Sequence, residues 1–340
     1  MSAIAAVSMR RPRIGFAGVG WIGLNRLKAV AAESLADIAC ITDVSSEATR
    51  RAMDEVAPHA PGVRVAQSFE ELLAEDLDGV VIATPSGLHA EQTVAALERG
   101  CAVFCQKPLA RTAEEVARTI ATARNCDRLL AVDFCYRMVA GVPQLVQLAR
   151  SGALGEIFAA DLVFHNAYGP DKPWFYDIEQ SGGGCVMDLG IHLVDLLLLV
   201  LDYPPVREVR SRLHAAGRLL ARPVVELEDH ALAEVQFETG TTARLACSWR
   251  LSAGRDAIIE AAFYGTRGAV VLRNVGGSFY EFVVEHCQGT SRHTLAEGPD
   301  QWGGRPVNTW ARQLAVAPGF DATAERLHDV SMLIDAIYGW

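Results

Sequence analysis

The sequence contains no Cys-x-x-Cys pair, and its eight cysteines are scattered along 340 residues. This spacing argues against a zinc site and gives no disulfide framework for a chain of this size. We therefore expect small core cysteines, no bound metal and a reducing, cytoplasmic environment. Cys185 borders a candidate site, and for it burial is favoured over reactivity.

Basic residues and long apolar runs are also scarce. The chain has 31 Lys and Arg against 41 Asp and Glu, a net charge of −10, which argues against nucleic acid or an anionic membrane as its main partner. The apolar run 196–201 is bounded by Asp195 and Asp202, so it predicts a buried helix segment and not a membrane span. Residues 1–12 lack the basic start of a secretory signal and predict a disordered leader.

The length predicts two domains, because 340 residues exceed one typical core. Half of the residues are hydrophobic, as in ordinary globular proteins. After residue 136 the regular alternation of predicted strands and helices ends. We predict a dinucleotide-binding domain over 13–136, a substrate and oligomerisation domain over 137–318 and a terminal helix within 319–340.

A glycine motif stands between a predicted strand, 13–17, and a predicted helix that runs to residue 32. It comprises Gly18, Gly20 and Gly23, with Trp21 and Ile22 inside it. In G-x-G-x-x-G the first glycine permits a tight turn and the second lets a pyrophosphate approach the backbone. The third allows the helix to pack closely on the strand, and the helix start supplies amides and a positive dipole end.

Asp43 strengthens this motif. It follows a second predicted strand, 38–42, and lies twenty residues after Gly23. A carboxylate there accepts hydrogen bonds from the adenosine ribose hydroxyls and repels a 2′-phosphate. The sequence therefore predicts a Rossmann domain that binds NAD in preference to NADP.

Strands and helices continue to alternate up to residue 132, which predicts a parallel, doubly wound sheet. Ligands of such sheets bind beyond the carboxyl ends of the strands. The residues that follow predicted strand ends are Thr84, Pro85, Ser86, His89, Gln106, Lys107, Pro108, Tyr136 and Arg137. Of these, we predict that Thr84, Pro85, His89, Gln106 and Lys107 contact the cofactor.

Lys107 is the candidate catalyst of this group, because a lysine in the crevice can polarise a carbonyl or stabilise a developing alkoxide. The alternative for Lys107 is a surface cation. His89 is favoured as a packing residue at a helix start. Arg137 either contacts substrate or pairs with an acid, and the sequence leaves that choice open.

The second domain reads as a strand at 157–164 followed, after a central helix, by several strands separated by turn signals, which predicts an antiparallel sheet. Between them lies an aromatic-rich loop over 166–180. Candidate walls of a sugar-sized pocket are Tyr136, Arg137, His165, Asn166, Tyr168, Trp174 and Tyr176. Packing within the loop is the alternative for the five candidates between 165 and 176.

The loop leads into a run of three glycines, 182–184, and then into a helical pattern. Asp188, His192 and Asp195 are four and three residues apart, so we expect all three near one face of that helix. A carboxylate and an imidazole one turn apart suit acid/base chemistry. The alternative is that Asp188 solvates the helix and His192 is a satisfied core histidine.

In order and spacing, these motifs resemble the Gfo/Idh/MocA oxidoreductases. The resemblance rests on the glycine motif, on Thr84-Pro85 with His89, on Gln106-Lys107-Pro108, and on the glycine run with Asp188 and His192. It implies a Rossmann domain joined to an α/β domain with a large open, mostly antiparallel sheet, assembled as a homodimer or homotetramer. It also implies NAD(P)-dependent oxidation or reduction of a secondary alcohol of a sugar, inositol or related polyol.

The resemblance assigns roles to three residues. Lys107 matches the catalytic lysine of a Glu-Lys-Pro motif, and Asp188 with His192 matches the acid/base pair. The motif's glutamate is Gln106 here, which puts the tuning of Lys107 and the cofactor contact of position 106 in question. Two other functions stay open: a tightly bound NAD used transiently for glycoside cleavage or epimerisation, and a non-catalytic NAD-binding regulator.

Overall fold

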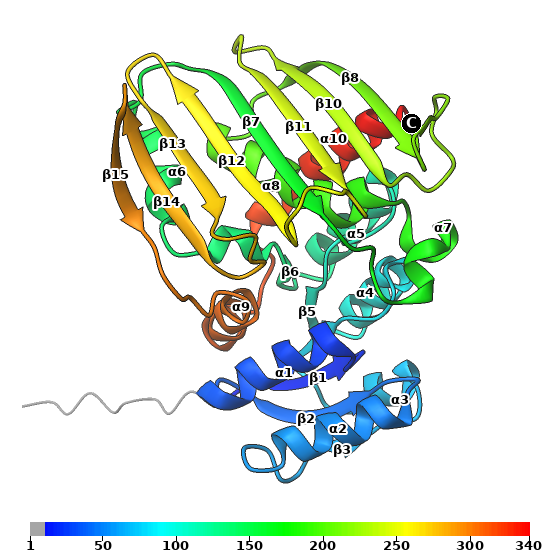
Figure 1. Ribbon diagram of the computed structural model, residues 1–340. Coiled ribbons are helices and arrows are strands. Elements are labelled where there is room, and N and C mark those ends of the chain that lie inside the picture. The colour runs from blue at the N-terminus through cyan, green and yellow to red at the C-terminus, as the bar shows by residue number, and fades with distance from the viewer. Residues whose placement is uncertain (1–10) are drawn as a thin grey trace, which may run out of the picture.

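The computed structural model describes residues 11–340, so the predicted leader over 1–12 lies almost entirely outside the described residues. The chain builds two β-sheets, each with its own helices (Figure 1).

The first sheet has six parallel strands in the order β3-β2-β1-β4-β5-β6. They are β1 (Arg13–Ala17), β2 (Asp37–Thr42), β3 (Arg64–Val65), β4 (Gly79–Ile82), β5 (Ala102–Cys105) and β6 (Leu130–Val132). Its helices are α1 (Trp21–Glu33), α2 (Ser46–Val56), α3 (Phe69–Leu73), α4 (His89–Glu98) and α5 (Ala113–Asn125). Every residue of β4 and β5 is buried, as expected for strands covered on both faces. The predicted Rossmann fold is confirmed, with its switch point between β1 and β4.

The second sheet has nine strands in the order β15-β14-β13-β12-β7-β11-β10-β8-β9. They are β7 (Ile157–Asn166), β8 (Val206–Ala215), β9 (Arg218–Leu219), β10 (His230–Phe237), β11 (Thr242–Ser248), β12 (Ala257–Gly265), β13 (Ala269–Asn274), β14 (Phe282–Gln288) and β15 (Ser291–Ala296). β7 and β11 run parallel, and the other pairs are antiparallel. The large, mostly antiparallel sheet is thus confirmed.

Burial alternates along this sheet, as in β10, because helices cover one face only. On that face lie α6 (Val142–Arg150), α8 (Ile191–Leu201) and α10 (Arg326–Tyr338), as Figure 1 shows. Within the described residues no helix lies on the opposite face, which we call the open face.

Helix α9 (Arg305–Val316) departs from the predicted domain boundaries. It lies in the segment 137–318 assigned to the second domain, yet it packs on α1 and β5 of the first. The ring of its Trp310 lies 5.8 Å from that of Phe104, and Val307 and Leu314 join the same core. The chain therefore returns to the Rossmann domain before α10 closes the second domain.

The stretch 178–201 joins the short helix α7 (Ile178–Ser181), a π-helical turn η4 (Val186–Gly190) and α8. By length and composition alone this stretch could cross a membrane, but 83% of its apolar window is buried inside the protein, which agrees with the predicted buried helix segment. Packing in the core of the second domain accounts for its apolar character.

Candidate active site

A cavity of about 2240 Å³ lies where the carboxyl ends of the parallel strands face the second domain. Ligand pockets usually measure about 300–1000 Å³, so this one has room for a dinucleotide and a second molecule. The predicted site residues on its wall are Gly18, Gly20, Trp21, Ile22, Asp43, Thr84, Pro85, His89, Gln106, Lys107, Tyr136, Trp174, Asp188 and His192.

The glycine loop fits a dinucleotide. Gly18 has a φ of +85°, and a Cβ there would lie 2.5 Å from the carbonyl oxygen of Ala83. A Cβ at Gly23 would lie 2.0 Å from the oxygen of Gly18, so the helix packs directly on the turn. A Cβ at Gly20 would meet nothing within 4 Å. Open space at the start of α1 is where a pyrophosphate would meet the helix amides.

Asp43 stands at the end of β2 and is held by two backbone amides. Its Oδ2 accepts from Val19 N at 2.8 Å and its Oδ1 from Ser45 N at 2.8 Å. Because each carboxylate oxygen has a second acceptor site, the side chain remains able to bind ribose hydroxyls.

Lys107 and Asp188 meet across the two domains. Lys107 Nζ donates to Asp188 Oδ1 at 2.7 Å and to the Asp188 backbone oxygen at 2.7 Å, and about 15% of each side chain is exposed. Trp249 Nε1 donates to Asp188 Oδ2 at 3.0 Å. The π-helical turn thus presents a carboxylate whose two oxygens have different donors.

His192 follows one turn later, at the start of α8, and is 7% exposed. Its ring packs against Tyr136 with a centroid distance of 4.8 Å, and no described residue hydrogen-bonds its Nδ1. Burial lowers the pKa of His192 well below 6.5, and the positive charges of Lys107 and Arg26 lower it further. His192 is therefore neutral at neutral pH and able to accept a proton.

His89 lies at the cavity wall but offers it no free nitrogen. Nδ1 lies 2.6 Å from the oxygen of Pro108 and Nε2 lies 2.7 Å from that of Thr84. His89 therefore connects the loops after β4 and β5, which agrees with a packing role, and neither ring nitrogen is left for the predicted contact with the cofactor.

Glu228 supports the glycine run from below. This carboxylate is 1% exposed and accepts from Gly184 N at 3.0 Å, Val186 N at 2.8 Å and the hydroxyl of Tyr338 at 2.9 Å. A Cβ at Gly184 would lie 1.9 Å from the backbone oxygen of Glu228, so only glycine fits there. Glu228 therefore fixes the turn that carries Asp188.

Changing Glu228 to glutamine should lower the free energy of unfolding by about 1–3 kcal/mol, because an amide nitrogen would face a buried N–H. Burial raises the pKa of Glu228 from 4.5 to about 7, although its three donors oppose the rise. Between pH 4.5 and 7 the folded protein binds this proton more strongly than the unfolded chain, so this contribution to stability falls as pH rises.

Urea titrations of both proteins at pH 5.5 and pH 8 check this, and the loss in Glu228→Gln should be larger at pH 5.5. Glu226→Gln is the matched control, since Glu226 forms an exposed ion pair with Arg218 and should change stability by less than about 0.5 kcal/mol. A loss that does not depend on pH would contradict the assignment.

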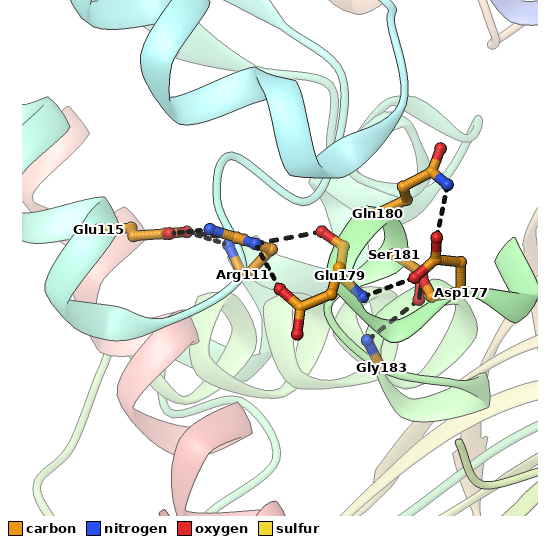
Figure 2. A network of polar contacts seen from close by, with 7 residues as sticks. All are labelled: Arg111, Glu115, Asp177, Glu179, Gln180, Ser181 and Gly183. Atoms are coloured by element: carbon orange, nitrogen blue, oxygen red, sulfur yellow. Dashed lines mark hydrogen bonds and ion pairs between the residues drawn. The ribbon is translucent and has the colours of Figure 1, made fainter. Parts of the chain in front are cut away.

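The segment before the glycine run is anchored to α5 (Figure 2). The Arg111 guanidinium donates to Glu115 at 2.6 Å and to the backbone oxygen of Glu179 at 3.1 Å. Asp177 caps α7 by accepting from Glu179 N at 3.0 Å, and Ser181 Oγ accepts from Gly183 N at 3.4 Å. These contacts connect the cavity wall at 181–183 to the first domain.

Two predicted residues pair with each other away from the cavity. Arg137 Nε donates to Asp195 Oδ2 at 2.9 Å, and Asp195 is 1% exposed. Arg137 therefore pairs with an acid, the second of its two predicted roles. Asp195 does not share the cavity face of Asp188 and His192, contrary to our expectation, because it turns toward Arg137.

Four aromatic or polar candidates also lie off the cavity wall. His165 is on the open face, with Nδ1 2.7 Å from Ser248 Oγ. Asn166 accepts from the backbone N of Tyr168, whose hydroxyl donates to Asp256. Tyr176 donates to the backbone oxygen of Pro170. Loop packing is thus what the structure shows for these side chains, and Cys185 is fully buried beside Cys247.

Several residues of the site carried no recognisable sequence signal. Trp249 reaches it from the residue after β11, Glu228 from the loop before β10 and Tyr338 from the last helix. Tyr280 and Trp302 line the cavity from the C-terminal third. Each is far in sequence from the motif it supports. Only the glycine run itself gave a signal, because three consecutive glycines allow another segment of the chain to approach their backbone closely.

Comparison with known proteins identifies both domains. Residues 12–134 match the family model "Oxidoreductase family, NAD-binding Rossmann fold", and residues 142–271 match "GFO/IDH/MocA C-terminal domain".

Similar curated proteins include 1,5-anhydro-D-fructose reductase of Ensifer adhaerens, 31% identical over 73% of this chain and 71% of that protein. D-glucoside 3-dehydrogenase of Escherichia coli is 27% identical over 78% of each chain. Among solved structures, levoglucosan dehydrogenase in complex with NADH and L-sorbose superposes with a TM-score of 0.80 at 21% identity, over 97% of this chain and 96% of that one. KijD10, a 3-ketoreductase from Actinomadura kijaniata in complex with NADP, gives a TM-score of 0.81 at 22% identity, over 96% and 97%.

Proposed function

The chain belongs to the Gfo/Idh/MocA family of oxidoreductases, and we propose that it transfers a hydride between NAD and a secondary alcohol of a sugar, inositol or related polyol. The observation that carries the proposal is the Lys107–Asp188 pair, 2.7 Å apart, with neutral His192 on the same cavity wall. The relatives' names, a reductase and dehydrogenases of sugars, support a sugar-like substrate.

A bound nicotinamide would supply the hydride acceptor. In the oxidative direction His192 takes the hydroxyl proton, and Lys107 Nζ stabilises the oxygen as negative charge develops on it. Asp188 holds Lys107 in place and orients the substrate. Trp174 and Phe175, whose rings stack at 3.8 Å, give the cavity an aromatic wall of the kind that sugar faces pack against.

The first test is NADH formation by the purified protein with NAD⁺ and a panel of inositols, aldoses, amino sugars and sugar acids. The protein is checked beforehand for nicotinamide that stayed bound through purification. Turnover of one compound that Lys107→Ala abolishes would support the dehydrogenase. If the protein retains bound cofactor but forms no NADH with any compound, redox-assisted glycoside cleavage or epimerisation is favoured instead. If the protein is purified without cofactor, binds NAD⁺ and forms no NADH, a non-catalytic NAD-binding regulator or a substrate outside the panel is favoured.

Asp43 supports NAD over NADP, because its carboxylate faces the cavity beyond β2. Changing Asp43 to asparagine should raise the Kd for NADH by about tenfold, since a charge-assisted hydrogen bond is worth about 1.5–3 kcal/mol. The Kd for NADPH should fall, because the repulsion of its 2′-phosphate is removed. Fluorescence titration with each nucleotide measures both changes.

Glu47→Gln is the control for Asp43, because Glu47 also lines the cavity and removing its charge leaves the end of β2 intact. Equal effects of the two variants on NADPH affinity would point to general charge and would contradict a specific role of Asp43.

The open face supports a homodimer or homotetramer. Leu232, 42% exposed, and the half-buried Val163 and Ile258 lie on it, and no helix of residues 11–340 covers them. A second copy of the chain covering this face would bury them. Light scattering after size-exclusion chromatography tests this, and a monomer at micromolar concentration would refute it.

A further inference from the structure

Beneath Lys107 lies a buried polar cluster formed by Arg26 of α1, Gln106 at the end of β5 and Asp133 at the end of β6. Arg26 Nε donates to Asp133 Oδ2 at 2.5 Å, and Gln106 Nε2 donates to the same oxygen at 2.7 Å. The three residues are 5%, 9% and 0% exposed. They link the three elements that meet below the cavity wall at Lys107.

The charges in this cluster balance. Arg26 and Asp133 form a buried ion pair, and Gln106 is neutral. Burial lowers the pKa of Arg26, but the charge and hydrogen bond of Asp133, together with the neighbouring Cys135, outweigh burial and hold that pKa above its ordinary value. Asp133 Oδ1 is buried and has no hydrogen-bond partner in the part of the chain described. A fully buried carboxylate with one oxygen that accepts no hydrogen bond contributes little to stability by itself. Stability therefore does not explain why an aspartate stands at position 133.

The amide of Gln106 is held at both ends. Its nitrogen donates to Asp133, which only accepts, and its Oε1 accepts from the backbone N of Lys107 at 3.2 Å. The orientation of that amide, and with it the backbone of Lys107, thus depends on the charge of Asp133.

A glutamate at position 106 would not fit beside Asp133. It would place two carboxylates about as close as Gln106 Nε2 and Asp133 Oδ2 are now, at 2.7 Å. Like charges at that distance in a buried site cannot both remain ionised, and Arg26 balances only one. Gln106 is therefore the residue that Asp133 requires.

We propose that Asp133 is a positioning residue for Lys107, and that it supplies from the end of β6 the buried negative charge that the Glu-Lys-Pro motif carries at position 106. An exchange of the carboxylate and the amide between positions 106 and 133 should therefore keep the charges of the cluster balanced. The inference rests on the proposed function, since what Asp133 positions is the backbone of Gln106 and Lys107 in the wall of the cofactor cavity. Lys107→Ala removes only a side chain and leaves that backbone in place, so it spares NADH affinity, whereas disrupting the cluster does not.

A double-mutant cycle tests the exchange. Gln106→Glu should raise the Kd for NADH by about tenfold or more and lower the melting temperature, because two carboxylates then meet. Asp133→Asn should do the same, because it leaves Arg26 buried without a counter-charge. Independent effects would multiply to about 100-fold in the double variant. We expect Gln106→Glu/Asp133→Asn to bind NADH within about threefold of the wild type and to recover most of the melting temperature.

The control pairs Gln106→Glu with Asp329→Asn, which gives the same net charge but alters an exposed pair on α10. It should rescue nothing. For the folded proteins, kcat should follow the same cycle; a purely structural Asp133 would change the melting temperature and leave kcat and Kd unchanged.

Each outcome is decisive. If a single variant does not fold, a folded double variant supports the exchange and an unfolded one overturns it. Multiplying effects of the singles, or equal rescue by Asp329→Asn, also overturn it. A wild-type protein that does not bind NAD(H) at all would refute the proposed function instead, so the two failures are distinguishable.

Discussion

Replacing Lys107 with alanine is expected to lower kcat by about 100- to 1000-fold, the usual cost of removing one donor that stabilises an oxyanion. The Kd for NADH should change by less than about threefold, because Lys107 Nζ is committed to Asp188 and the glycine loop and Asp43 hold the distant part of the nucleotide. Steady-state kinetics on the substrate found in the panel and a fluorescence titration of NADH measure the two quantities.

The chain has only three lysines, which simplifies the control. Lys28 lies at the edge of the same cavity, is about half exposed and forms an ion pair with the exposed Glu55, so Lys28→Ala should leave kcat unchanged. Losses of similar size in kcat and in cofactor affinity for Lys107→Ala would mean that Lys107 acts mainly by binding, and the alkoxide role would be withdrawn. Thermal melting of both variants separates either result from misfolding.

The first domain could be predicted because its signals are local. The glycine loop needs glycine for reasons that act within a few residues: Gly18 has a positive φ, and Gly23 leaves no room for a Cβ. Buried parallel strands are continuous apolar runs, and β4 and β5 were found in this way. Strand ends then identified the edge where Thr84 and Lys107 meet.

The second domain was predicted less completely because its site depends on contacts between distant segments. Asp188 and His192 share the cavity, as their spacing indicated, but Asp195 pairs with Arg137, and no spacing rule reveals a partner 58 residues away. The aromatic loop suggested pocket walls, yet Tyr176 packs on Trp249 while Trp174 lines the cavity. Helix α9 is amphipathic, but its sequence alone does not reveal on which of the two domains its apolar side packs.

The site also shows how its charges are distributed. Lys107 is paired with Asp188 and Arg26 with Asp133, so two cations and two carboxylates are balanced within the protein. Burial lowers the pKa of His192 most, the charges of Lys107 and Arg26 lower it further, and His192 is the titratable group of the proposed trio without an ion partner. Neutral His192 is therefore a consequence of the whole arrangement and not of one contact.

His192→Gln should consequently lower kcat for alcohol oxidation by about 100-fold or more, because the amide cannot accept the hydroxyl proton. His59→Gln is the control, since His59 is an exposed histidine at the cavity rim and its loss should not affect kcat. An unchanged kcat in His192→Gln would remove His192 from the mechanism.

The pH profile tests the same assignment in the wild type. A base must be unprotonated to act, so a pKa well below 6.5 keeps His192 active at lower pH, and kcat/KM should stay level as pH falls through 6.5. Burial is the main cause of this shift, and Lys107 adds to it. The residual activity of Lys107→Ala should therefore begin to fall at a higher pH than that of the wild type, because one repelling charge is gone. An acid limb at or above pH 6.5 in the wild type, or the same limb in both proteins, would show that His192 is not the base that the profile reports.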